Sequence, residues 1–394
     1  MEPKIRLKGF KGEWRNTVVE SVCDISTGKS NTQDKVADGK YPFYVRSSII
    51  ERSNKYLYDE EAVLTAGDGV GTGKVFHYVN GKYDLHQRVY RMFNFRNIVP
   101  KFFYYVFSTK FYERVMSMTA KSSVDSVRYD MIAFMKINTA IEKEEQQAIA
   151  SYFQHLDSLI QSTAKKIESF KQVKAASLQS MFPQEGETTP RVRFKGFRGE
   201  WEKVLVGKMG TTYSGLSGKT KDDFGIGGAR FVTFLNVLTN AIIDTSILEA
   251  VNVFEGEHQN EVRKGDLLFN TSSETPEEVG MCAVMDEDLT NVYLNSFCFG
   301  FRVTDENIDS TFIAYLMRSH IGRRIMSILA QGATRYNLSK NSFCKAELLL
   351  PKTKAEQQLI AKYFTSLDSQ ITLQTQRLEK LKQIKSACLD KMFV

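Results

Sequence analysis

The 394-residue sequence has few of the residue patterns that build metal sites, disulfide frameworks or membrane spans. Its five cysteines are scattered and odd in number, without a Cys-x-x-Cys pair, and its five histidines stand apart from other metal-ligating side chains. No apolar run approaches the length of a membrane-spanning helix, and the opening MEPKIRLKGF lacks the apolar core typical of a secretion signal. We therefore expect reduced thiols, no bound metal and a cytoplasmic location.

The sequence also lacks the motifs of common enzyme classes. The segment Gly67–Lys74 (GDGVGTGK) is similar to a phosphate-binding loop, but Asp68 stands where that loop needs glycine and Val75 where it needs a hydroxyl. We interpret it as a turn between two strands and keep a nucleotide site as the alternative. A nucleophile elbow, a dinucleotide fingerprint and the Asn-Pro-Pro-aromatic signature of amino-methyltransferases are all missing. We predict no catalytic residue in this chain.

What the sequence does contain is a duplication. The segment Glu145–Ile160 (EQQAIASYFQHLDSLI) returns 211 residues later as Glu356–Ile371 (EQQLIAKYFTSLDSQI), with eleven of sixteen positions identical. The segment Arg6–Trp14 (RLKGFKGEW) returns 187 residues later as Arg193–Trp201 (RFKGFRGEW). Such self-similarity is the signature of repeated structural units, although the sequence between these segments has diverged. The pattern predicts one scaffold that presents two different recognition surfaces.

These repeated segments divide the chain into five parts. We predict a first mixed α/β block over 1–141, a long helix over 142–182, a linker over 183–190, a second block over 191–353 and a second long helix over 354–394. Short β-branched and aromatic runs between glycine-containing turns are typical of strands in an α+β block. The fold class is therefore α+β with a pseudo-two-fold internal repeat.

Each block also contains one run with helical spacing of its apolar residues. PKFFYYVFSTKFYERVMS (100–117) predicts a helix in the first block, and TFIAYLMRSHIGRRIMSILA (311–330) predicts the matching helix in the second. AVLTAG (62–67) and RFVTFLNVL (230–238) are examples of the predicted strands.

Both predicted long helices carry apolar residues at alternating steps of four and three, which is a heptad pattern. One copy alone fits a helix packed on its own block, whereas two copies in one register favour two helices paired with each other. We expect this pair to be antiparallel, because the chain must return from the second block. Lys174 and Lys385 interrupt the seam at equivalent positions and are expected to fix its register. The predicted seam residues are Ile149, Phe153, Leu156, Ile160, Ile167, Phe170, Ile360, Phe364, Leu367, Ile371, Leu378 and Leu381.

Several loops combine basic side chains with amide or hydroxyl groups, the mixture that contacts phosphates and base edges of duplex DNA. Residues 1–141 hold 22 Lys and Arg against 15 Asp and Glu, whereas residues 191–353 hold 19 against 20. The first block is thus the more typical polyanion binder, and the second depends on local clusters. The candidate DNA-binding residues are Lys29, Asn31, Arg46, Lys74, Arg88, Arg91, Lys121, Arg128, Lys219, Lys221, Arg323, Arg335, Asn337 and Lys340.

This layout resembles the DNA-specificity subunits of type I restriction–modification systems. The resemblance rests on the repeated RxKGFxGEW and EQQxIAxYFxxLDSxI segments, the LTAGDGVGTGKV turn, and NLS before ELLLP in the second block. It implies two target-recognition domains that alternate with two long spacer helices and each read one half of a split target. It implies no catalytic residue in this chain.

The resemblance also implies partners. Two methyltransferase subunits would use S-adenosylmethionine to methylate adenine, and restriction subunits would use ATP and Mg to translocate and cut foreign DNA. The chain itself would bind double-stranded DNA and no cofactor, and the helix pair would fix the gap between half-sites. The alternative is a coiled-coil adaptor whose two blocks bind proteins, which would also explain the nearly neutral second block.

Overall fold

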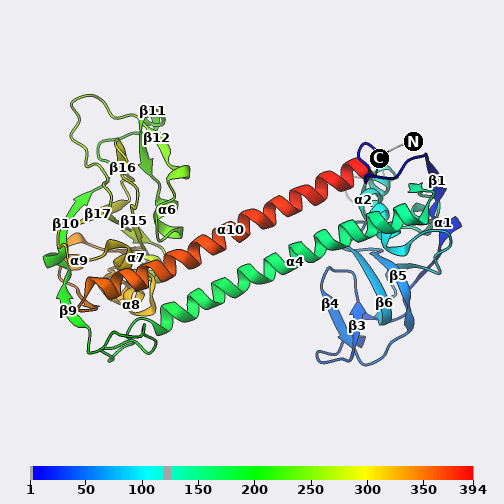
Figure 1. The fold of residues 1–394 in the computed structure, drawn as a ribbon, viewed down its shortest axis with the longest axis horizontal. Helices are drawn as coiled ribbons and strands as arrows, with labels where there is room; N and C mark the ends of the chain where they lie inside the picture. Colours follow the sequence, from blue (N-terminus) through cyan, green and yellow to red (C-terminus); the bar gives the residue numbers. More distant parts are fainter. Residues whose placement is uncertain (1–2, 119–125, 333, 394) are drawn as a thin grey trace. The chain divides into compact units, whose positions relative to one another are not determined.

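The computed structural model describes residues 3–118, 126–332 and 334–393 (Figure 1). It separates into two compact units. Unit 1 comprises Met1–Lys165 together with Thr375–Val394, and unit 2 comprises Lys166–Gln374. Each unit therefore contains one globular block and one stretch of each long helix.

The two long helices are α4 (Lys143–Ser180) and α10 (Lys354–Met392). Neither contains glycine or proline, so no residue interrupts the backbone hydrogen bonds of either helix. Pro183 follows the end of α4 in the sequence, where proline commonly stands after a helix. The described part of the chain contains no helix that is long and apolar enough to cross a membrane.

The block of unit 1 is built on a six-stranded sheet. Neighbouring strands are antiparallel except β3 and β6, which are parallel. The long β5 buries its AVLTA end, which matches the predicted strand, and the turn at Gly67–Lys74 leads from β5 to β6 as expected. In sheet order the strands are β2 (Asp24–Thr27), β7 (Val89–Phe93), β5 (Tyr58–Ala66), β6 (Phe76–Leu85), β3 (Tyr41–Tyr44) and β4 (Ile50–Ser53).

One helix, α2 (Pro100–Ser117), fills the core of unit 1 and confirms the helix predicted there. Phe103, Phe107 and Phe111 are fully buried and stack in succession, with centroid separations of 5.4 and 4.4 Å. The remaining elements of the block are α1 (Val19–Val22), η1 (Thr32–Asp34), α3 (Tyr129–Ala133) and the antiparallel pair β1 (Trp14–Val18) and β8 (Lys136–Ala140).

The block of unit 2 contains two sheets and two short strand pairs. A four-stranded antiparallel sheet lies beside a three-stranded sheet in which β11 is antiparallel to β12 and parallel to β16. The strands are β10 (Gly210–Ser214), β17 (Cys298–Val303), β13 (Leu267–Asn270) and β15 (Cys282–Val284); β12 (Glu249–Val251), β11 (Phe224–Val232) and β16 (Val292–Leu294); β14 (Ser272–Ser273) with β18 (Tyr336–Asn337); and β9 (Glu202–Leu205) with β19 (Glu347–Leu350).

Two predictions for unit 2 are corrected by the structure. The single helix predicted over 311–330 is two helices. The Ser319 hydroxyl donates to the Leu316 carbonyl at 2.6 Å at the end of the first helix and accepts from the Gly322 N–H, which caps the start of the second helix at His320. The strand predicted over 230–238 ends at Val232, where Thr233 caps a short helix. The helices of this block are α5 (Val206–Met209), α6 (Phe234–Thr239), α7 (Ser310–Arg318), α8 (His320–Leu329) and α9 (Lys340–Cys344), with η2 (Lys221–Asp223), η3 (Thr245–Ile247) and η4 (Pro276–Glu278).

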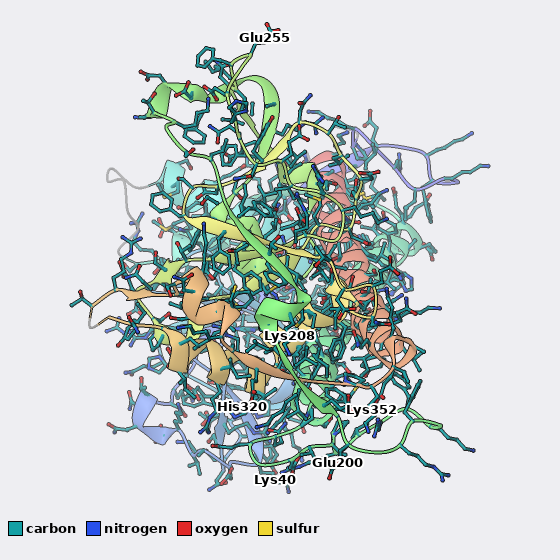
Figure 2. The ribbon with its side chains drawn as sticks, turned by 90° about the vertical axis from the view of Figure 1, so that its left-hand side faces the viewer. Lys40, Glu200, Lys208, Glu255, His320 and Lys352 are labelled. Atoms are coloured by element: carbon teal, nitrogen blue, oxygen red, sulfur yellow. The ribbon has the colours of Figure 1, made fainter. Side chains whose placement is uncertain are left out.

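The two blocks share one topology despite their divergent sequences. The order β2-β7-β5-β6 in unit 1 corresponds to β10-β17-β13-β15 in unit 2, with every neighbour antiparallel. The pair β1–β8 likewise corresponds to β9–β19. The inserts differ: unit 1 adds β3 and β4, and unit 2 adds the β11 sheet. Figure 2 shows Glu255 at the tip of this second insert, away from Lys208 and His320.

The repeated segments meet in the cores of the units. In unit 1, the Phe393 ring lies 6.3 Å from Trp14, 5.6 Å from Phe102 and 5.7 Å from Phe153. In unit 2, Phe182 takes the place of Phe393 and lies 6.3 Å from Trp201, 5.7 Å from Phe312 and 5.8 Å from Phe364. Each block is thus completed by the end of the long helix that starts from the other block.

Candidate nucleic-acid interface

In unit 1, candidate cations surround a hollow of about 600 Å³ at one end of the sheet. The end of β2, the start of β7 and the end of β5 come together there, because these neighbouring strands are antiparallel. Lys29 and Arg88 line the hollow, and both side chains are exposed. Gly28 sets the position of Lys29, since a Cβ at Gly28 would lie only 2.2 Å from the Leu85 carbonyl oxygen.

A hydrogen-bonded loop borders this hollow. The Gln87 amide donates to the Asn31 side-chain oxygen at 2.6 Å, so two candidate readers of base edges are held together. Asn31 also caps η1 through a reciprocal bond with Asp34. The loop therefore presents amide groups beside cations, as direct reading of bases requires.

One carboxylate organises two of the predicted arginines. Asp68 accepts a hydrogen bond from Arg46 at 3.2 Å and lies 3.8 Å from the Arg88 guanidinium. The side chains of both arginines are exposed to water. Lys74 lies 4.8 Å from the Tyr112 ring centre, a cation–π arrangement that leaves the lysine exposed.

The other candidate DNA-binding residues of unit 1 differ in their exposure and in their protein contacts. Arg128 is exposed and directly precedes α3, where it donates to Asp130 at 3.3 Å. Arg91 is partly buried between the Phe93 and Tyr58 rings and donates to Glu60 and Ser26, so its donors are already engaged by protein groups. Lys121 lies outside the described residues.

Unit 2 repeats the loop that follows the first strand of the sheet. Thr220 caps η2 through a reciprocal bond with Asp223, as Asn31 caps η1 with Asp34. Lys221 is exposed on this loop, whereas Lys219 is nearly covered and forms an ion pair with Glu257 at 2.5 Å. The predicted equivalence of the two loops therefore has a structural counterpart, with one accessible lysine in place of two.

The second candidate cluster of unit 2 lies around β18. Arg335 and Asn337 are exposed, and the Asn337 amide donates to the Arg335 carbonyl at 3.2 Å. Lys340 begins α9, at the position that Tyr129 holds at the start of α3, and donates to the Ser214 hydroxyl at the end of β10. Lys340 is therefore the member of this cluster that contacts the end of β10.

Arg323 belongs to the interior rather than to a surface cluster. Its guanidinium donates to the backbone carbonyls of Glu277, Val279 and Gly280, and burial lowers its pKa to about 10. Arg318 is similarly bonded to carbonyls, and burial lowers its pKa as well. We therefore leave Arg323 out of the interface. The amphipathic sequence of 311–330 gives no sign of these carbonyl acceptors, which are distant along the chain.

The predicted seam residues are all at least partly buried, but not all in the same way. Ile149, Phe153 and Leu156 belong to the core of unit 1, and Ile360 and Phe364 belong to the core of unit 2. For these residues the helix packs on its own block, which was the alternative interpretation of the heptad pattern. The partly buried members are Ile160, Phe170, Leu367, Ile371, Leu378 and Leu381, and Ile167 is buried.

The two seam lysines each complete a triad of polar side chains. In unit 1, Asp157 accepts hydrogen bonds from Tyr105 of α2 at 2.7 Å and from Lys385 of α10 at 2.5 Å. Asp157 lies on α4, so one carboxylate connects three helices. Burial, reinforced by the bond to Asp157, raises the pKa of the Tyr105 hydroxyl, so it remains a donor at neutral pH.

Unit 2 contains the same triad with the roles of the long helices exchanged. Asp368 of α10 accepts from Tyr315 of α7 at 2.8 Å and from Lys174 of α4 at 2.5 Å. Burial and the neighbouring Asp368 charge raise the pKa of Tyr315. The aspartate and the tyrosine were not singled out from the sequence, although Asp157 and Asp368 are both part of the repeated LDS motif.

Residues missed by the sequence analysis also contribute to the hollow of unit 1. Thr27, Asp68 and Tyr90 line it beside the predicted Lys29 and Arg88. Tyr90 was hidden by its position in a strand, although strand alternation places it on the face opposite Val89 and Arg91.

All five cysteines are free thiols, and burial raises the pKa of Cys23 and of Cys298 to about 12.

Comparison with known proteins identifies the family. The profile described as "Type I restriction modification DNA specificity domain" matches residues 11–172 and 200–383. The MjaVIII type I specificity subunit of Methanocaldococcus jannaschii is 21% identical over 378 residues, which cover 91% of this chain and 86% of that protein. The EcoDI specificity subunit of Escherichia coli is 26% identical over 190 residues, or 46% of this chain and 40% of that protein.

Solved structures show the same fold. The type I S subunit from M. genitalium superposes with a TM-score of 0.68 at 17% identity, covering 100% of this chain and 99% of that one. A chain from a structure of type I restriction–modification complex assembly gives 0.52 at 14% identity, with coverages of 97% and 98%.

The two units share a duplicated α+β frame and carry different loops on it. This chain belongs to the family of type I restriction–modification DNA-specificity subunits, which recognise DNA sequence.

Proposed function

We propose that this chain is a non-catalytic subunit that reads a two-part DNA target, one half through each unit. The observation that carries the proposal is that the frame is repeated while the loops differ. Each unit has the same Tyr–Asp–Lys triad between its helices. A frame that is held constant under variable loops is suited to two independent readings of DNA. Lys29, Arg88 and Arg128 would contact DNA from unit 1, and Lys221, Arg335 and Lys340 from unit 2.

We further propose that α4 and α10 form an antiparallel pair that sets the gap between the half-sites. Supporting contacts occur within each unit. In unit 1, Tyr152 contacts Cys388 and Asp157 contacts Lys385. Residue numbers along α10 therefore decrease as those along α4 increase, as in an antiparallel pair. In unit 2 the contacts Lys174–Asp368 and Ser177–Tyr363 run in the same sense. A seam with one polar residue at a fixed place specifies a single register.

The partners follow from the same proposal. Val173, Leu373 and Ile384 are each more than a third exposed on the long helices and would dock two methyltransferase subunits. Those subunits would use S-adenosylmethionine to methylate adenine, and restriction subunits would use ATP and Mg. The reacting groups would all belong to partner subunits, and this chain would supply the DNA sequence preference.

The decisive experiment is methylation mapping by single-molecule sequencing of a host that carries the cognate methyltransferase, with and without this chain. We expect adenine marks in a two-part motif with one fixed gap, only when the chain is present. A stable complex that leaves no chain-dependent marks would instead favour the adaptor, whose blocks bind proteins.

The loops of unit 1 are tested by the triple variant Lys29→Ala, Arg88→Ala and Arg128→Ala in the assembled complex. Each lost phosphate contact lowers the slope of log affinity against log salt by about 0.9, so three contacts lower it by about 2–3. The matched control removes three exposed cations elsewhere, Lys8, Lys11 and Arg15. An unchanged slope in the triple variant would remove these loops from the interface.

A further inference from the structure

In unit 2, the segment after α4 lies against its own block and covers a small cavity there. Pro183, Gln184, Gly186 and Glu187 line one side of this cavity of about 190 Å³. The opposite side is formed by Leu316, Ile321 and Ile325 of α7 and α8 and by residues 347–349 of β19. Pro183 is buried, although it lies in a linker. The linker therefore continues from Phe182 into a seat beside the core.

Acidic groups hold this segment in place. The Glu185 carboxylate accepts a hydrogen bond from Arg324 of α8, and Glu187 accepts one from the backbone N–H of Gln184 at 3.2 Å. The Glu187 N–H also donates to the Gln184 carbonyl at 2.9 Å, which folds the segment into a tight turn. Unit 2 thus shows how this frame accommodates a short acidic peptide that begins with proline.

Unit 1 has the same seat as an open groove of about 750 Å³, which we call the α2/β8 groove. Three features establish the equivalence. Val106 takes the place of Leu316, and residues 136–138 of β8 take the place of residues 347–349 of β19. Phe393, which lines the groove, has the aromatic neighbours in unit 1 that Phe182, just before Pro183, has in unit 2. The lining of the groove includes Val106, Lys110, Glu113, Lys136, Ile137 and Phe393.

The α2/β8 groove differs from its counterpart in charge. Lys110, Arg114 and Lys136 line it against a single carboxylate, Glu113, whereas the residue equivalent to Lys136 in unit 2 is the acidic Glu347. The Arg114 Nε donates to the Met131 carbonyl at 3.1 Å, which fixes its guanidinium near the groove. Basic walls around an apolar floor attract an occupant that is acidic and partly apolar.

We propose that the α2/β8 groove binds a short extended segment of a partner protein. This segment begins with proline or a similar small apolar residue and carries carboxylates. The apolar first residue of the segment packs on Val106, Ile137 and Phe393, as Pro183 packs on the equivalent surface of unit 2. The carboxylates meet Lys110 and Lys136. Phe134, which is 55% exposed at the rim, covers the segment from one side.

A protein segment fits this groove better than a DNA backbone does. The floor is formed by buried apolar side chains, Val106, Met135 and Ile137, which offer no partner to a phosphate. The counterpart in unit 2 holds a peptide. The experiment therefore has to distinguish peptide binding at the groove from DNA binding there.

The test uses a fluorescent peptide with the sequence PQEGETT, that of residues 183–189, titrated into the full chain and followed by anisotropy. We expect saturable binding that weakens at least tenfold in the variant Lys110→Glu with Lys136→Glu, and that is lost for the charge-reversed peptide PQKGKTT. Lys8→Glu with Lys11→Glu is the matched control in the same unit and should bind like the parent chain. Thermal melts of each variant establish that the fold is kept.

Two outcomes would overturn the proposal. Absence of saturable binding to the parent chain would exclude a peptide seat. A Lys110 and Lys136 variant that binds the peptide normally but loses DNA affinity in the assembled complex would assign the groove to DNA. Methylation mapping is independent of the peptide titration, so failure here leaves the recognition function standing.

Discussion

Unit 1 and unit 2 employ their repeated residues in the same structural roles and their cations in different ones. In each unit an arginine of the first repeated segment forms a two-pronged ion pair with the first glutamate of the EQQ motif, Arg6 with Glu145 and Arg193 with Glu356. Both glutamates are almost fully buried. The pair fastens the start of a long helix to its block, so the most similar positions of the sequence are the positions that hold the frame together.

The cations show the contrast. In unit 1, the Arg88 side chain is 66% exposed and Lys29 is exposed beside the hollow. In unit 2, Lys219 is paired with Glu257 and Arg323 is bonded to backbone carbonyls. Lys29 and Arg88 are therefore more accessible than Lys219 and Arg323, which protein groups engage. If both units bind DNA as proposed, we expect a larger electrostatic contribution from unit 1 and a larger share of polar contacts in unit 2.

The largest expected effect tests whether the two cores are equivalent. Phe182→Ala and Phe393→Ala should each lower the free energy of unfolding by about 3–5 kcal/mol, because each ring is fully buried among aromatic partners. Urea unfolding of the full chain measures both. Phe297→Ala is the control, since this ring is 58% exposed and its loss should cost less than about 0.5 kcal/mol. A small cost for one of the two buried rings would break the equivalence.

The next effect separates a structural arginine from a DNA-facing one. Arg323→Ala should destabilise the chain by about 2–3 kcal/mol, because several backbone carbonyls lose their donor. Its DNA binding, measured at a temperature where the variant is folded, should keep the parent salt slope. Arg128→Ala should do the opposite, leaving stability unchanged and lowering the slope by about 0.9. Reduced DNA affinity of folded Arg323→Ala would return that residue to the interface.

The sequence was informative where residues repeat and uninformative where contacts are distant. The heptad steps identified the apolar face of each long helix, but Phe153 and Phe364 are core residues of their own units, because periodicity shows which face is apolar and not what covers it. The surface charge of Lys219 and Arg323 was mispredicted, since Glu257 and the carbonyls of 277–280 approach only in the folded chain. Whether the remaining loop cations contact DNA stays a prediction.

A smaller effect compares the two triads. Asp157→Asn and Asp368→Asn should each destabilise the chain by about 1–2 kcal/mol, because the lysine loses its ionic partner while the tyrosine keeps an acceptor. Both aspartates are about a third exposed, which keeps the cost below that of a fully buried pair. The matched control is Asp390→Asn on the exposed face of α10. Costs that differ by more than the measurement error would show that the triads are not interchangeable.

The smallest expected effect comes from moving the chain ends. The backbone N–H of Lys4 donates to the Lys391 carbonyl at 2.9 Å, so a few glycine and serine residues suffice to join the termini within unit 1. We expect a permutant joined there and reopened between Thr189 and Pro190 to fold within about 1 kcal/mol of the parent, because loop closure depends weakly on loop length. This cut leaves Pro183–Glu187 on its seat in unit 2.

Methylation mapping of the permutant should give the same two half-sites and the same gap as the parent chain. The control permutant is reopened at Thr163, inside α4, where the cut interrupts continuous helical hydrogen bonds and should abolish the marks. If the linker permutant lost its marks while it remained folded, then continuity from α4 into the second block would be needed for recognition. The two units would then be unequal partners, because only the connection through α4 would be indispensable and the connection between the chain ends would not replace it.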